Sequence, residues 1–217
     1  MRFSSSRCAA IVRVVSTLAL AQFLSAQQGL PARATPTDYQ TQAKVGPVTI
    51  GAEFTGHGIP NAQQPLNAED YVAVEVGLFG AADARLTIGP TDFSLRINGK
   101  KDLLPSQPWG LVAKGVKDLE WVSPDAVPGE SKSKGSVNGG GGGGQGGSTL
   151  PPPPPKVPID VLRGWQLAVK NAALAQGDRA LPQAGLIYFP YRGKVTSIRS
   201  LELIYEGPAG TASLTLQ

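Results

Sequence analysis

The stretch Tyr71-Val72-Ala73-Val74-Glu75-Val76-Gly77-Leu78-Phe79 decides the fold class of this chain. Within it, large aliphatic residues stand at every second position, and small or polar residues stand between them. Successive side chains of a strand point to opposite faces of a sheet. The alternation therefore predicts a β-strand with one strongly buried face.

Similar patterns lie on both sides of this stretch. Upstream, residues 45–54 predict a first strand. Further strands are predicted downstream, at residues 85–88, 92–97, 120–123, 185–189, 198–205 and 211–216. Asn98-Gly99 predicts a tight hairpin turn because both residue types tolerate positive φ. An antiparallel sheet system is the simplest arrangement of these strands.

One segment has a different period. Apolar residues recur there at helical spacing, namely Leu162, Trp165, Val169, Ala172 and Ala173. Pro158 suits the first turn of a helix, and Gly177 suits its end. We expect an α-helix over about residues 159–175, although Gly164 disfavours it.

A tract of low complexity separates the two groups of strands. It contains six consecutive glycines, Gly139 to Gly144, and five consecutive prolines, Pro151 to Pro155. Glycine maximises backbone freedom, and a proline run is an extended rod without backbone donors, so the tract cannot pack. Residues 125–157 are predicted to form a disordered insertion. The proline run is a spacer or, alternatively, a polyproline ligand.

Neither half of the chain is large enough to bury a robust core without disulfides. Joined, the halves give about seven short strands in about 140 residues, which is the scale of a β-sandwich. We therefore expect a single β-sandwich domain over residues 44–217, with two independent domains as the alternative. A phosphate-binding loop is excluded, because Gly147 stands where that motif needs lysine.

Several of these segments resemble a known family. They are Tyr71–Val76, Ile88–Leu95, Asn98–Lys101, Ala184–Phe189 and Leu201–Tyr205. Together they are similar to the telokin-like, immunoglobulin-like domains of secreted bacterial proteins of unknown function. The resemblance implies an immunoglobulin-like antiparallel β-sandwich and a cell-envelope setting, and it carries over no catalytic residue. The predicted helix and the Gly/Pro insertion depart from the family pattern.

The N-terminal residues indicate export. Residues 1–26 combine a basic start with an apolar run and end at Ala26, which is typical of a signal peptide cleaved after that residue. Cleavage after Ala32 or Ala34 is an alternative, as is an N-terminal membrane anchor. Residues 27–43 are predicted to be a flexible mature N-terminus. We expect a periplasmic, cell-surface or secreted protein without a transmembrane segment after cleavage.

Composition excludes several classes of function. Cleavage after Ala26 leaves 17 Lys and Arg residues against 16 Asp and Glu residues, a formal net charge of +1. Nucleic-acid binding is not expected, because it needs clustered positive charge. The cleaved chain also has no cysteine, so disulfides and thiolate chemistry are ruled out for it.

The densest aromatic and basic group of the cleaved chain is the possible interaction surface, formed by Tyr191, Arg192, Lys194 and Arg199. Such a group can contact an acidic glycan, a lipid headgroup or an acidic protein face, or it is an ordinary charged hairpin connection. His57, the sole histidine, is predicted to be a solvated loop residue. No catalytic residue, metal ligand or cofactor is predicted.

These observations favour a non-catalytic envelope or secreted protein, an interaction or structural module whose partner is an unknown protein or cell-envelope component. A carbohydrate- or ligand-binding module is an alternative and needs an exposed aromatic platform. A small exported hydrolase is another alternative. It requires His57 to meet Asp or Glu in a pocket between the two halves.

Overall fold

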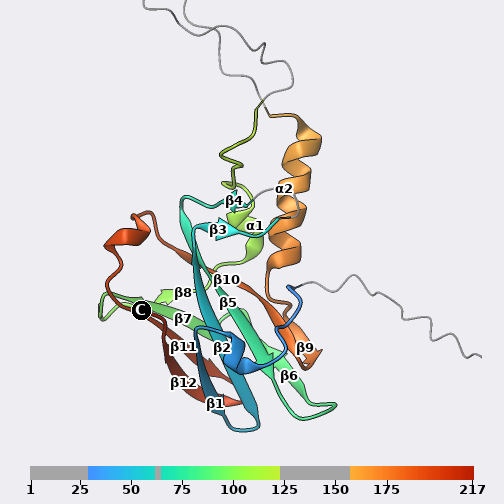
Figure 1. Ribbon diagram of the computed structural model, residues 1–217, viewed down its shortest axis with the longest axis vertical. Coiled ribbons are helices and arrows are strands. Elements are labelled where there is room, and N and C mark those ends of the chain that lie inside the picture. Colours follow the sequence, from blue (N-terminus) through green and yellow to red (C-terminus); the bar gives the residue numbers. More distant parts are fainter. Residues whose placement is uncertain (1–28, 62–64, 123–156) are drawn as a thin grey trace, which may run out of the picture.

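The computed structural model describes residues 29–61, 65–122 and 157–217 (Figure 1). Its strands are β1 (Thr41–Val45), β2 (Val48–Gly56), β3 (Gly58–Ile59), β4 (Leu66–Asn67), β5 (Tyr71–Phe79), β6 (Arg85–Ile88), β7 (Phe93–Ile97), β8 (Leu104–Pro105), β9 (Gly177–Ala180), β10 (Gln183–Pro190), β11 (Leu201–Gly207) and β12 (Gly210–Thr215). Its helices are α1 (Trp109–Val112) and α2 (Ile159–Ala172), with 3₁₀ turns η1 (Pro36–Asp38) and η2 (Val195–Ser197). The expectation of a mainly β chain is confirmed.

Two four-stranded antiparallel sheets dominate the structure, with strand orders β1-β2-β5-β10 and β12-β11-β7-β8. The pairs β3-β4 and β6-β9 form two small additional sheets. Strands from before and after residues 123–156 meet in three of these sheets, because β10 pairs with β5, β11 with β7 and β9 with β6. The two parts of the chain therefore complete one another's sheets.

The facing sides of the two large sheets share one hydrophobic core. Its centre consists of fully buried aliphatic residues, among them Val72, Val74, Val76 and Leu78 from β5 and Leu95, Leu201 and Leu203 from the other sheet. The period-two prediction for β5 is thus confirmed. The opposite side of β5 is covered as well, since Ala73 and Gly77 are also buried there.

A second hydrophobic cluster lies where α2, α1 and the β3-β4 pair gather at one end of the sheets (Figure 1). Trp165 and Val169 of α2 belong to it, together with Ala73 and Tyr188 of the sheet. The Tyr188 hydroxyl donates a hydrogen bond to the carbonyl of Val169 at 3.1 Å. Burial raises the pKa of this hydroxyl, so it remains protonated as a donor.

The helix ends earlier than predicted. Ala173 has extended dihedral angles and forms a bridge to Leu186, and Leu174 donates its amide to the Leu186 carbonyl at 2.9 Å. Residues 173–175 are buried against β10 and are not helical. Their apolar character reflects this contact, and the periodicity alone did not distinguish it from another helical turn.

The prediction of a flexible N-terminus over residues 27–43 is wrong for the part that the structure describes. Leu30 forms a bridge to Ala184, η1 follows, and β1 pairs with β2. The predicted first strand is also split, because Gly46 has a φ of +54° and turns the chain between β1 and β2. The sequence pattern did not predict β1, because the strand is mostly polar and only its Val45 is buried.

Three other expectations were tested. Residues 120–122 are not a strand. Residues 177–180 form β9, where a helix stop was predicted. The Asn98-Gly99 turn is confirmed by φ values of 54° and 65°, but the partner strand β8 begins only at Leu104. The predicted signal peptide, residues 1–26, and residues 125–156 of the predicted insertion lie outside the described residues.

No helix among the described residues is both long enough and apolar enough to span a bilayer.

Candidate functional site

The predicted interaction surface lies in the connection between β10 and β11. Tyr191, Arg192 and Lys194 precede η2, and Arg199 follows it. Tyr191 and Arg192 line one groove, whereas Lys194 and Arg199 are not among its lining residues. The structure thus brings two of the four predicted residues together at a concave site.

This loop groove has a volume of about 820 Å³, within the range of small-ligand sites. One wall is the chain after β10, and the other is the connection from β7 to β8. The charged residues of its lining carry both signs and are Asp70, Lys100, Asp102 and Arg192. Ile97 and Leu104 contribute an apolar part. Such a lining suits a polar ligand that presents both positive and negative groups.

Asn98 joins the two walls of the groove. Its side-chain carbonyl accepts hydrogen bonds from the backbone amides of Arg199 at 2.6 Å and Ser200 at 3.2 Å. Its side-chain amide donates to the Ser197 carbonyl at 3.1 Å. Asn98 has a left-handed backbone conformation with a φ of 54°, and in it the side chain faces residues 197–200. Asn98, which the sequence predicts to lie in a turn, therefore also anchors the loop between β10 and β11.

Two further contacts fix the aromatic and basic residues of the groove. Arg192 forms an ion pair with Asp70 at 3.0 Å, and the Arg192 side chain is 83% exposed. The Tyr191 hydroxyl lies 2.7 Å from the Ser197 hydroxyl. Because the ion pair is solvated, it orients the two side chains more than it stabilises the fold.

His57 lies in the turn between β2 and β3, as predicted for a loop residue, but it is partly buried rather than fully solvated. Its Nδ1 is 2.7 Å from the Tyr71 carbonyl oxygen and 3.1 Å from that of Ala68. Its Nε2 is 3.0 Å from the Gly193 carbonyl oxygen. The ring stacks on Tyr191, with centroids 6.3 Å apart. Both ring nitrogens therefore contact the backbone.

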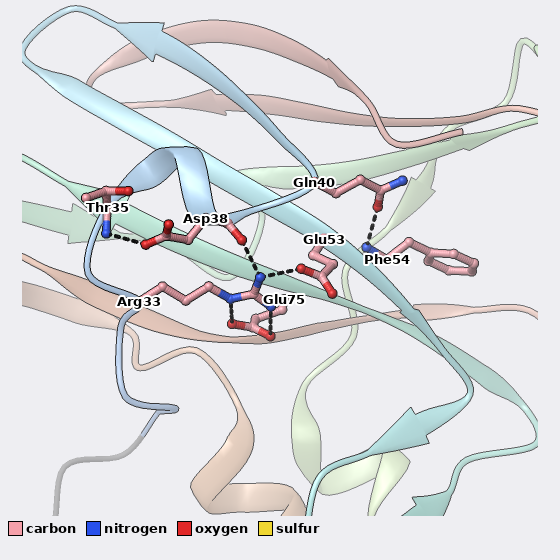
Figure 2. A network of polar contacts seen from close by, with 7 residues as sticks. All are labelled: Arg33, Thr35, Asp38, Gln40, Glu53, Phe54 and Glu75. Carbon is pink, nitrogen blue, oxygen red and sulfur yellow. Dashed lines mark hydrogen bonds and ion pairs between the residues drawn. The ribbon is translucent and has the colours of Figure 1, made fainter.

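A second polar network lies on the outer face of the sheet formed by β1, β2, β5 and β10 (Figure 2). Arg33 contacts both carboxylate oxygens of Glu75, at 3.3 and 3.1 Å, and forms an ion pair with Glu53. It also donates to the Asp38 carbonyl at 2.6 Å and lies over the Tyr39 ring at 4.5 Å. Hydrogen bonds to Glu53 and Glu75 raise the pKa of Arg33. Sequence reasoning missed this network, which ties the N-terminal segment to the sheet.

The tryptophans belong to the helical cluster rather than to the groove. Trp165 is buried, and Trp121 packs edge-on against it with centroids 6.5 Å apart. Trp109 lies beneath the Lys170 ammonium at 5.7 Å. Among the described residues, no group of three His, Cys, Asp or Glu side chains is placed to hold a metal ion.

A scan against protein-family models, a search of curated proteins and a search of solved structures found no match to this chain.

Proposed function

We propose that this protein is an exported, non-catalytic binding module, and that its loop groove takes up a polar segment of a partner protein in the cell envelope. The fold that we propose for it is an immunoglobulin-like β-sandwich. The strand order, the environment of His57 and the lining of the groove support this proposal.

The strand order supports the immunoglobulin-like assignment. In such sandwiches strand B pairs with strand E, and strands G, F and C lie side by side, with C′ added in the variable type. Here β5 pairs with β10, and the second sheet has the order β12-β11-β7-β8. The strands β5 and β10 thus correspond to B and E, and β12, β11, β7 and β8 correspond to G, F, C and C′. The additions are β1 at one edge, the β3-β4 and β6-β9 pairs, and the α-helical segment between C′ and E. The resemblance to telokin-like domains points the same way.

The contacts of His57 are the observation that carries the non-catalytic assignment. A catalytic histidine needs one nitrogen free for the substrate or nucleophile, and a metal ligand needs one for the ion. In this fold both nitrogens lie within 3.1 Å of backbone carbonyl oxygens. The imidazole therefore supports three chain segments, which argues against the hydrolase alternative.

The groove lining favours a protein segment as ligand. Exposed charges of both signs stand beside the Tyr191 ring and the Asn98 turn. A peptide offers matching charges and backbone groups, whereas a nucleic acid offers uniform negative charge. A carbohydrate platform needs an accessible aromatic face. Trp165 is buried, and the partly buried Trp121 and Trp109 pack against Trp165 and Lys170, respectively.

The docked N-terminal segment supports cleavage after Ala26. Gly29 and Leu30 donate hydrogen bonds to Asn171 and Ala184, and Arg33 forms the network described above. Cleavage after Ala26 keeps all of these contacts, while cleavage after Ala34 removes them. We therefore propose that the mature chain begins at Gln27.

Site-directed photo-crosslinking tests this function. A photoreactive residue at Arg192 should crosslink the native chain to a discrete envelope protein in the source cells. A matched control carries the same residue at Thr211, an exposed position on β12 at the opposite end of β11. Equal crosslinking yields from the two positions would contradict the proposed groove function. The absence of a protein adduct from both positions would contradict it as well.

A further inference from the structure

A second groove lies along α2. It has a volume of about 720 Å³ and shares no lining residue with the loop groove. One wall is the flank of α2 that carries Val161, Gly164, Ala168 and Asn171, which stand at helical spacing. The other wall is formed by residues 118–122, which run beside the helix (Figure 1). We call this site the helix groove.

Large apolar side chains are exposed at the helix groove. Leu167 of α2 is 55% exposed, Val122 of the facing wall is 72% exposed, and both line the groove. Trp165, which is buried, and Trp121, which is partly buried, complete an apolar lining. Contiguous exposed apolar side chains of this kind mark protein-docking surfaces.

Gly164 has no explanation in the fold itself. Its φ is not positive, and an added Cβ would meet no atom within 4 Å, so neither the backbone nor the packing requires glycine there. Glycine also disfavours a helix interior relative to alanine. What the missing side chain does is keep the helix groove open, so that an occupant can approach the backbone of α2 closely.

The charged residues of the lining, Asp118 and Glu120, are both acidic. Asp118 accepts a hydrogen bond from the amide of Glu120 at 2.9 Å. Within the described part of the chain, neither side chain forms an ion pair, and the adjacent Lys117 pairs with Glu69 instead. An occupant with positive groups would complement these acids, whereas an acidic one would be repelled.

We propose that the helix groove docks a protein segment in which apolar side chains are flanked by lysine or arginine. The apolar side chains pack between Leu167 and Val122 and against α2 at Gly164, and the basic groups meet Asp118 and Glu120. A second copy of this chain that docked through the same face would bring the acids of both copies to one interface, which disfavours it. This site does not rest on the function proposed for the loop groove.

NMR titration of the chain from Gln27 with two synthetic peptides tests the docking site. Both peptides have the same leucine-rich centre, which is flanked by lysines in one and by glutamates in the other. The lysine peptide should shift the signals of the Gly164 amide and the Trp121 indole. It should also bind at least about tenfold more tightly than the glutamate peptide, and high salt should reduce this difference. Equal affinities, shifts confined to residues outside the helix groove, or no shifts at millimolar peptide would overturn the proposal.

Variants locate the binding. Leu167→Lys and Glu120→Lys should each weaken binding of the lysine peptide by about tenfold. Leu111→Lys is the matched control, because Leu111 is 43% exposed and lies outside the groove lining, and its affinity should not change. Gly164→Gln fills the groove without adding charge, so it should weaken binding as much while urea unfolding shows no loss of stability. Unchanged binding in the groove variants, or an equal loss in Leu111→Lys, would contradict the docking site.

Two other occupants would give different results. If a second copy fills the groove, Leu167→Lys will convert a dimer to a monomer in sedimentation of the peptide-free chain. If residues of the chain's own 123–156 segment fill it, the lysine peptide will bind only after residues 131–155 are deleted. Either result overturns the proposal. Neither affects crosslinking from position 192, which tests the loop groove separately.

Discussion

The ring of Tyr39 lies against two glycines of the outer sheet face, Gly51 and Gly77, which are register partners on β2 and β5. A Cβ at Gly77 would lie 2.5 Å from Cζ of Tyr39, and a Cβ at Gly51 would lie 2.5 Å from its Cδ2. The absence of side chains at these positions lets the ring approach the backbone closely. Arg33 then covers the ring and reaches the acids on either side.

At the residue scale, Arg33→Met should destabilise the fold by about 1.5–3 kcal/mol, the typical worth of hydrogen bonds to charged groups. The reason is that Glu75, whose side chain is only 14% exposed, loses its partner. Urea unfolding measures the change. Arg85→Met is the control, since its pair with Asp178 is more than half exposed and should be worth less than about 1 kcal/mol. Equal losses in both variants would contradict a structural role for the Arg33 network.

Individual residues also show which contacts could be predicted from the sequence and which could not. Tyr191 and Arg192 were singled out because aromatic and basic residues adjoin in the chain, and both line the groove. His57 was misjudged, since its partner Gly193 lies 136 positions away. A backbone carbonyl carries no residue identity, so no sequence pattern marks it as a hydrogen-bond partner.

At the element scale, α2 owes its stability to packing more than to helix propensity. Trp165, Val169 and Ala172 are buried on one face. Gly164 stands in the helix interior on the exposed side, where an added Cβ would meet no atom within 4 Å. The helix therefore forms despite a residue that disfavours it.

Gly164→Ala should accordingly stabilise the protein by about 0.5–1 kcal/mol, because alanine loses less backbone entropy in a helix. Thermal unfolding followed by circular dichroism checks this. Gly185→Ala on β10 is the contrasting variant, since its Cβ would lie 2.5 Å from the backbone of Leu174, and it should destabilise. A loss of stability in Gly164→Ala would contradict this account of the helix interior.

Elements were predictable where large apolar residues alternate with small or polar ones along the sequence, as in β5, β7 and β11. The strand β9 was not, because all four of its residues are exposed and it exists through pairing with β6. The same holds for β1, whose residues are mostly outside the core. Pairing with a neighbour, rather than burial, makes these segments strands.

For the whole molecule, the mixed sheets predict how a cut chain behaves. A specific protease site placed within residues 123–156 should give two fragments that co-elute in size-exclusion chromatography and separate only in denaturant. The reason is that β5-β10, β7-β11 and β6-β9 all join one fragment to the other. Fragments that separate in native buffer would show that the two parts fold independently.

The sequence by itself determined the local structure: the mainly β character, the strands with regular alternation, the Asn98-Gly99 turn and most of α2. Periodicity reports which face of an element is buried, and that is a local property. The tertiary structure decided what each buried face meets, how β9 and β1 become strands, and how Arg33 and His57 find their partners. Those outcomes depend on contacts between residues far apart in the chain, and such contacts leave no period in the sequence.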